Sequence, residues 1–214
     1  MTNPQQTVPA TGDGALRLVK KFRRPAFWLV ALAACGLLAV SASAWQNAVA
    51  PIIMRNLGAV LLLVCALGRL WSSLYIVGYK NDRLITAGPY SLVRNPLYVF
   101  SFCGALGMGL SAESLYVVAL LIIPFLVWFP IMVIEEERFL AGRYPDEWTA
   151  YTQTTPRFIP ALRAPVVPES YTVNARRLGH AFMDAIWFPI GGLAMQGVVQ
   201  LHQANVLPNL WKIY

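Results

Sequence analysis

Apolar runs long enough to cross a lipid bilayer constrain this chain more than any other feature of its sequence. Residues 115–134 contain no charged side chain. As a helix rising ~1.5 Å per residue they would span about 30 Å, the thickness of a hydrocarbon core. Similar runs cover 26–45 and 57–78, a shorter one covers 97–110, and a weaker one covers 181–201. Because lipid cannot satisfy free backbone hydrogen bonds, each run is predicted to be helical.

The sequence therefore predicts an all-α integral membrane protein with about five transmembrane helices. The composition agrees, since 57% of the 214 residues are hydrophobic and only 13% are charged. Cys35, Cys65 and Cys103 all lie inside apolar runs, and His180 and His202 belong to no cluster with ligand spacing. These residues are typical of buried side chains, so neither a disulfide framework nor a metal site is expected.

Four segments are expected along the chain. Residues 1–24 form a basic tail that is predicted to be disordered, and 25–78 hold two transmembrane helices. Residues 79–168 form a core that carries the candidate functional residues, and 169–214 hold a last helix. Pro189, Gly191 and Gly192 interrupt that helix, so it is either transmembrane or interfacial. It packs on its own monomer or on a second copy, which leaves a homodimer open.

Basic residues are distributed unevenly among the predicted loops. Of the 17 Lys and Arg residues, 14 fall within 1–24, 79–96 and 135–180. Cytoplasmic loops of membrane proteins carry such an excess, so the N-terminus and these segments are predicted to be cytoplasmic, at the inner membrane if the source is bacterial. The same distribution explains the net charge of +7 without nucleic-acid binding. It also places residues 79–96 and the carboxylates 135–137 on one membrane face.

The turn-rich segment 88–98 and the carboxylates 135–137 carry the candidate chemistry. Negative charge at the end of an apolar helix opposes the helix macrodipole. If the helix continues, at ~100° per residue the three carboxylates cannot all face one way. Alone they are compatible with a solvated helix boundary. Beside Tyr90, Arg94 and Tyr98 they favour a site that holds a polar or cationic ligand.

Five short motifs occur in a fixed order over about residues 84–160. They are Gly88-Pro89-Tyr90, Arg94-Asn95-Pro96-Leu97-Tyr98, Glu136-Glu137-Arg138-Phe139-Leu140, the pair Tyr144 and Tyr151, and Pro156-Arg157-Phe158-Ile159-Pro160. In this order they resemble the isoprenylcysteine carboxyl methyltransferase and phospholipid methyltransferase superfamily. The segments outside this region match the superfamily only generically or not at all.

The resemblance implies an integral membrane methyltransferase that transfers a methyl group from S-adenosylmethionine to a lipid-like or hydrophobic acceptor by in-line displacement. It implies a cytoplasmic-face cofactor pocket formed by Leu84, Ile85, Gly88, Tyr90, Asn95, Pro96, Leu97, Tyr98, Glu136 and Glu137. Catalytic roles are implied for Arg94, Asn95 and Glu137, and a substrate contact is implied for Arg157. A cationic sulfonium suits carboxylates and aromatic faces.

Two positions depart from the superfamily pattern. Many members have His where this chain has Asn95, and Asn cannot act as a titrating base. Prenylcysteine enzymes place an Arg about one turn before the acid pair, where this chain is apolar near Met132. A lipid amine, a thiol or another hydrophobic acceptor is therefore favoured over a prenylcysteine. The alternative functions are an NADPH-dependent membrane reductase of the sterol-reductase type and a non-catalytic membrane scaffold.

Overall fold

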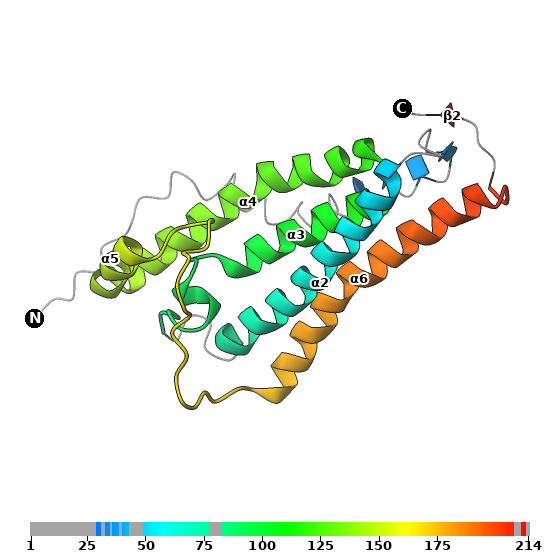
Figure 1. The fold of residues 1–214 in the computed structure, drawn as a ribbon. Helices are drawn as coiled ribbons and strands as arrows, with labels where there is room; N and C mark the ends of the chain where they lie inside the picture. Colours follow the sequence, from blue (N-terminus) through cyan, green and yellow to red (C-terminus); the bar gives the residue numbers. More distant parts are fainter. Residues whose placement is uncertain are drawn as a thin grey trace, which may run out of the picture.

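The computed structural model describes residues 29–30, 33–34, 36–38, 40–42, 49–77, 83–207 and 211–212. Nearly all regular structure in them is helical (Figure 1): α2 (Val49–Ile76), the 3-10 turn η1 (Pro89–Ser91), α3 (Pro96–Ser111), α4 (Leu115–Arg143), α5 (Pro145–Thr154) and α6 (Ala175–Gln203). Two-residue strands β1 (Ser41–Ala42) and β2 (Trp211–Lys212) pair in parallel. The predicted tail 1–24 lies outside the described residues.

Three of the described helices, α2, α4 and α6, are long and apolar enough to cross a membrane. With 28 or 29 residues, each extends for about 42–44 Å. The apolar helix α3 has 16 residues and is shorter than a usual span. Only scattered residues of the predicted span 26–45 are described. The structure thus fits an integral membrane protein with three candidate spans, and the number five stays a prediction.

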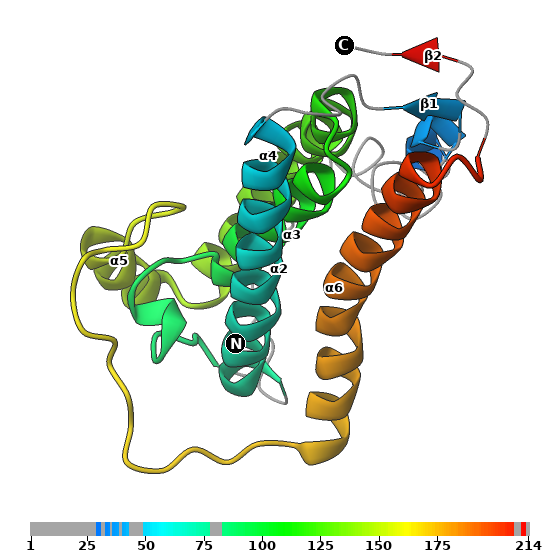
Figure 2. The same ribbon diagram turned by 45° about the vertical axis from the view of Figure 1, so that its right-hand side comes forward.

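The long helices form one bundle in which α3 packs against α2, α4 and α6, and α6 also packs along α2. Both views show α6 running beside α2 for most of its length (Figures 1 and 2). The last helix therefore packs on its own monomer. Its continuous length through Pro189 favours a spanning helix over an interfacial one.

Glycines allow α2 and α3 to approach closely. A Cβ atom at Gly107 of α3 would lie 2.9 Å from the carbonyl oxygen of Gly58 in α2, and a Cβ at Gly58 would lie 2.9 Å from the carbonyl oxygen of Gly107. Small residues at such crossings bring helix backbones together in membranes. Gly58 and Gly107 therefore permit the close crossing of α2 and α3.

Arg69, which lies inside α2, has polar and aromatic partners in the bundle. Its guanidinium donates a hydrogen bond to the hydroxyl of Ser101 in α3 and lies 5.2 Å from the ring centroid of Phe188 in α6. An arginine at this depth is costly unless it faces the bundle interior. These contacts place Arg69 among the residues that hold α2, α3 and α6 together.

The outward faces of the spans are strongly apolar. Large exposed side chains follow one another along α2, and others occupy α4 and α6; they include Ile53, Leu57, Val60, Leu63, Leu67, Ile123, Leu126, Val127, Ile190 and Leu193. An aqueous surface rarely carries such a continuous apolar area, whereas acyl chains solvate it. The exposed faces therefore agree with a bilayer around the bundle.

Helix α4 begins at Ser114, whose hydroxyl accepts a hydrogen bond from the amide of Val117. It continues past the apolar run to Arg143, so the carboxylates 135–137 lie inside the helix and not at its end. The macrodipole therefore does not act against them as it would in the last turn.

At one end of the bundle, α2 and α4 finish and α3 and α6 begin. We call this end, where α5 lies, the α5 end. From there, residues 155–174 run round to α6 (Figure 2).

The glycine contact generates a stability prediction. Replacing Gly107 by Ala is expected to lower the thermal unfolding temperature in detergent, because the new Cβ meets the Gly58 carbonyl. Overpacking costs about 1–3 kcal/mol, which exceeds the ~0.5–1 kcal/mol that Ala gains over Gly in a helix. Gly197→Ala in α6 is the matched control, since nothing lies within 4 Å of its Cβ position. An unchanged or higher unfolding temperature for Gly107→Ala would contradict the close crossing.

Candidate functional site

The turn between α2 and α3 is built around Gly88, which has a φ of +60°. L-residues with a side chain rarely adopt this conformation, and a Cβ here would also collide with the ring of Tyr75. The amide of Gly88 donates to the carbonyl of Val166 at 2.7 Å, and the hydroxyl of Ser91 donates back to the Gly88 carbonyl at 2.7 Å. Glycine therefore fixes the path of the chain into η1.

The segment after α5 holds this turn from the other side. The amide of Arg94 donates to the carbonyl of Pro156 at 2.8 Å, and the amide of Ala161 donates to the carbonyl of Leu92 at 2.9 Å. These backbone hydrogen bonds connect residues 62 and 69 positions apart. They fix the turn at the α5 end of the bundle, beside the end of α4.

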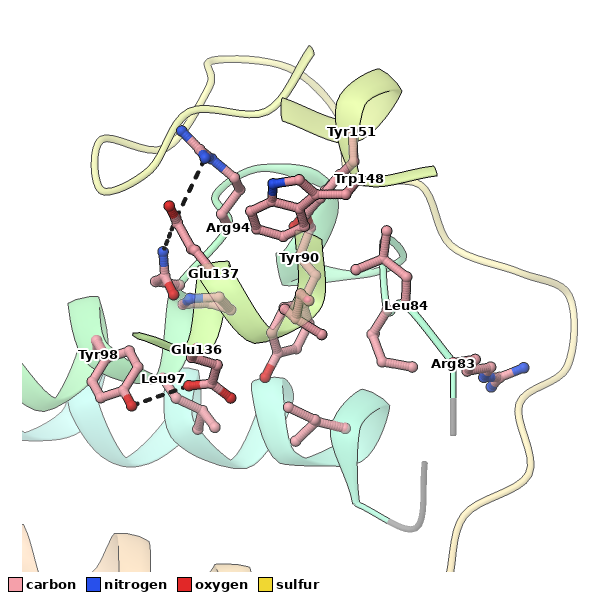
Figure 3. Close-up of a pocket in the computed structure, with 15 residues that line it drawn as sticks. Arg83, Leu84, Tyr90, Arg94, Leu97, Tyr98, Glu136, Glu137, Trp148 and Tyr151 are labelled. Carbon is pink, nitrogen blue, oxygen red and sulfur yellow. Dashed lines mark hydrogen bonds and ion pairs between the residues drawn. The ribbon is translucent and has the colours of Figure 1, made fainter. Parts of the chain in front are cut away.

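Two of the three consecutive carboxylates, Glu136 and Glu137, line a pocket between this turn and α4 (Figure 3). The hydroxyl of Tyr98 donates to Oε2 of Glu136 at 3.1 Å. The Nδ2 of Asn95 donates to Oε1 of Glu137 at 3.0 Å. The segment 88–98 and the carboxylates 135–137 therefore meet, as the charge distribution predicts.

Glu137 is the buried centre of an ionic cluster. Its Oε2 accepts hydrogen bonds from Nε and a terminal nitrogen of Arg157 at 2.9 and 2.6 Å. Its Oε1 lies 3.4 Å from a guanidinium nitrogen of Arg94 and also accepts from Asn95. The Glu137 side chain is only 8% exposed, so this pairing offsets the cost of removing the charge from water.

Tyr90 contributes a buried hydroxyl that points into the pocket towards Glu136 (Figure 3). The residue is 6% exposed, and its hydroxyl has no hydrogen-bond partner in the part of the chain that the structure describes. Burial, followed by the charge of Glu136, raises the pKa of Tyr90 well above its usual value. The phenol therefore stays neutral at physiological pH and is available as a donor.

Two aromatic residues of α5 close the pocket on its outer side. The ring centroids of Trp148 and Tyr151 are 5.8 Å apart, and the Arg94 guanidinium lies 5.9 Å from the Trp148 ring. The hydroxyl of Tyr151 donates to the carbonyl of Tyr90 at 2.7 Å. Helix α5, which begins at Pro145, thus orients both the pocket wall and the turn.

Most residues that the sequence predicts for this site line one pocket: Leu84, Ile85, Tyr90, Arg94, Asn95, Pro96, Leu97, Tyr98, Glu136 and Glu137. Gly88 shapes the turn, and Arg157 contacts the cluster through Glu137, but neither belongs to the lining. The prediction gave no site role to the lining residues Ile76, Arg83, Leu140, Trp148 and Tyr151, although Leu140 and Tyr151 belong to the quoted motifs. The spacing of Trp148 and Tyr151, which places them on one helix face, was the available signal.

An apolar groove adjoins the pocket and shares Tyr98 with it. Its remaining lining is Val99, Phe102, Phe125, Leu126, Phe129, Pro130 and Phe158. The rings of Tyr98 and Phe129 meet edge to face with centroids 4.8 Å apart, and those of Phe125 and Phe129 stack with centroids 3.4 Å apart.

Within the described residues, no group of three or more His, Cys, Asp or Glu side chains could hold a metal ion.

The ionic cluster generates a second stability prediction. Glu137→Gln removes the charge that holds Arg94 and Arg157, so we expect it to lower stability by about 1–3 kcal/mol, as for lost hydrogen bonds to a charged group. The readout is the thermal unfolding temperature in detergent. Glu147→Gln on the exposed first turn of α5 is the control. Equal unfolding temperatures for the two variants would show that the cluster does not hold the segments together.

Comparisons with known proteins give two kinds of match. The family described as phospholipid methyltransferase matches residues 53–147. The cobalt-zinc-cadmium resistance protein CzcN of Cupriavidus metallidurans is 36% identical over 165 residues, 77% of this chain and 76% of that protein. The nickel-cobalt-cadmium resistance protein NccN of Alcaligenes xylosoxydans xylosoxydans is 31% identical over 167 residues, 78% of each chain. No solved structure matches at a comparable level of significance.

Proposed function

Because this chain belongs to the phospholipid methyltransferase family, part of the isoprenylcysteine carboxyl methyltransferase-type superfamily, we propose that it transfers a methyl group from S-adenosylmethionine to a hydrophobic acceptor in the membrane. The supporting observation is that the two motif-bearing segments meet in one pocket, through the Tyr98–Glu136 and Asn95–Glu137 hydrogen bonds. The family match favours methyl transfer over the reductase and scaffold alternatives.

The donor set of the pocket fits S-adenosylmethionine. Tyr90 offers a buried hydroxyl that no described residue engages, and Glu136 offers carboxylate oxygens beside it. An amino group or ribose hydroxyl can donate a hydrogen bond to such a carboxylate. A ligand that accepts a hydrogen bond from the buried hydroxyl removes the free-energy cost of leaving that donor unsatisfied. Tyr98 and Trp148 add aromatic faces, which attract a cation.

S-adenosylmethionine, when bound, supplies an electrophilic methyl group on a positively charged sulfur. We assign to Glu136 the binding of its polar groups, with Tyr98 orienting that carboxylate through the 3.1 Å hydrogen bond. Tyr90 and Trp148 exclude water from the same space. The rate of an in-line displacement is raised mainly by such positioning of the reactants and by the exclusion of water from the site.

Arg94, Asn95 and Glu137 line the pocket but also contact one another, through the Asn95–Glu137 hydrogen bond and the Arg94–Glu137 ion pair. We therefore infer that they act mainly by positioning. Asn95 connects the turn to α4, because its Nδ2 contacts both Glu137 and the carbonyl of Arg157. Leu84, Ile85, Pro96 and Leu97 complete the apolar part of the lining.

The apolar groove supports a hydrophobic acceptor. It opens beside Tyr98, so an acyl chain lying along Phe125 and Phe129 would bring its polar end to the pocket. Arg157, whose side chain is 46% exposed, stands beside Glu137 and can meet an anionic part of that acceptor. A lipid amine and a thiol are equally compatible with this groove as the methyl acceptor.

We propose that the α5 end faces the cytoplasm. Arg83, Arg94, Arg157 and Arg163 all lie in the segments at that end, whereas Arg55 lies near the start of α2 at the other. Such a distribution is typical of cytoplasmic faces. The names of the two relatives further suggest that methylation occurs in the setting of resistance to divalent metals.

Binding of S-adenosylmethionine gives the first test. Calorimetry on the purified protein in detergent is expected to show saturable binding, and Glu136→Gln or Tyr98→Phe is expected to weaken it about tenfold or more, as a lost charge-assisted hydrogen bond does. Glu147→Gln changes an exposed residue that does not line the pocket, and it is expected to bind normally. Folded protein that binds no S-adenosylmethionine would refute the proposal.

Turnover gives the second test, with membranes from cells grown with and without Zn²⁺, Co²⁺ and Cd²⁺ as the acceptor source. Methyl-labelled S-adenosylmethionine is expected to label a lipid-extractable product, which mass spectrometry identifies. Leu126→Trp, which narrows the groove, is expected to lower the rate several-fold without changing cofactor affinity. Ile123→Trp is equally lipid-facing, does not line the groove and is the control. Equal rates for both variants would place the acceptor elsewhere.

A further inference from the structure

The loop that follows α5, residues 156–163, exposes large apolar side chains. It carries five apolar residues, 158–162, between Arg157 and Arg163. Both arginines have partners in the protein although they stay exposed: Arg157 donates to Glu137, and Arg163 donates to the carbonyl of Ser91. The apolar side chains turn outward: Ile159 is 81% exposed and Leu162 is fully exposed at 105%. A loop in water rarely leaves such large apolar side chains uncovered so close together.

The position of Phe158 shows how deep this loop lies. Phe158 lines the apolar groove together with Phe129 and Pro130 of α4. The first charge after the apolar run of α4 is Glu135, so at ~1.5 Å per residue Pro130 lies about 7.5 Å and Phe129 about 9 Å inside it. Phe158 is therefore level with the hydrocarbon-solvated part of α4. The loop turns back towards this part of α4 in Figure 1.

The two ends of the loop are fixed to the site turn. The carbonyl of Pro156 accepts from the Arg94 amide at 2.8 Å, and the Ala161 amide donates to the carbonyl of Leu92 at 2.9 Å. Pro156 and Pro160 carry no amide hydrogen, which leaves fewer backbone donors to satisfy at the apolar boundary. The loop is thus held at its base by the protein while its apolar tip stays uncovered.

We propose that residues 156–163 form a membrane anchor that inserts into the leaflet at the α5 end, with Ile159 and Leu162 among the acyl chains. Phe158 forms the loop side of the apolar groove. Amphipathic segments at interfaces bury their apolar side chains about 5–10 Å deep, which agrees with the level of Phe158 along α4. The anchor sets the height of the turn 88–95 relative to the lipid. The inference concerns lipid contact alone and does not rest on methyl transfer.

The anchor is tested by nitroxide labels on the full chain in phospholipid nanodiscs. Labels go on Ile159→Cys and Leu162→Cys after Cys35, Cys65 and Cys103 are replaced by Ala. Electron paramagnetic resonance compares collisions with oxygen, which partitions into lipid, and with a water-soluble nickel chelate. Ile123→Cys on the lipid-facing side of α4 is the lipid control, and Glu147→Cys on α5 is the water control.

The logarithm of the oxygen-to-nickel collision ratio is expected to be positive at 159, 162 and 123 and negative at 147. Values at 159 and 162 that match position 147 would overturn the proposal. Low accessibility to both reagents would also overturn it, because it would mean that a second copy or another protein covers the loop. If the cysteine-free chain fails to fold, the labels go on the native chain and the spectrum of the equally labelled parent is subtracted.

Discussion

The buried carboxylate of Glu137 ties together three segments that are far apart in the chain. It receives Asn95 and Arg94 from the turn after α2 and Arg157 from the loop after α5, while its own backbone belongs to α4. A carboxylate removed from water is stable only when it is paired and hydrogen-bonded, so these partners are required by its burial. The shape of the pocket follows, because its remaining lining residues lie on these segments or on the helices that adjoin them.

The bilayer explains why this cluster lies at the end of the bundle. Charges inside a hydrocarbon core are costly, and irregular backbone there must be covered or wet. Helix α4 continues beyond its apolar run to Arg143, which brings Glu136 and Glu137 level with the turn. The short helix α3 begins at the same level with Pro96, and its contact with α2 at Gly107 fixes its height. The polar pocket and the apolar groove can therefore both be lined by Tyr98.

The sequence predicted much of the candidate site because its signals are local. Tyr90, Asn95 and Tyr98 occur in a turn-rich motif, Glu136 occurs beside a membrane-length run, and the positive charge distribution placed both on one face. Trp148 and Tyr151 were missed because their spacing marks a helix face but does not say which face meets the pocket. The sequence left open whether α4 ends at its carboxylates or continues past them. It continues to Arg143, because a helix leaving the bilayer can extend into water wherever its backbone hydrogen bonds are kept.

By itself, the sequence determined the helical class, the apolar runs of α2, α4 and α6, and the residues that carry the family motifs. Hydrophobicity and turn chemistry act over short stretches of chain, so one sequence is enough to recognise them. Tertiary structure alone decided that Glu137 pairs with Arg157 and Arg94 while Glu136 accepts a hydrogen bond from Tyr98, and that Ile159 and Leu162 are exposed. Neighbouring carboxylates look identical in sequence, and only packing determines which of them is paired with the two arginines.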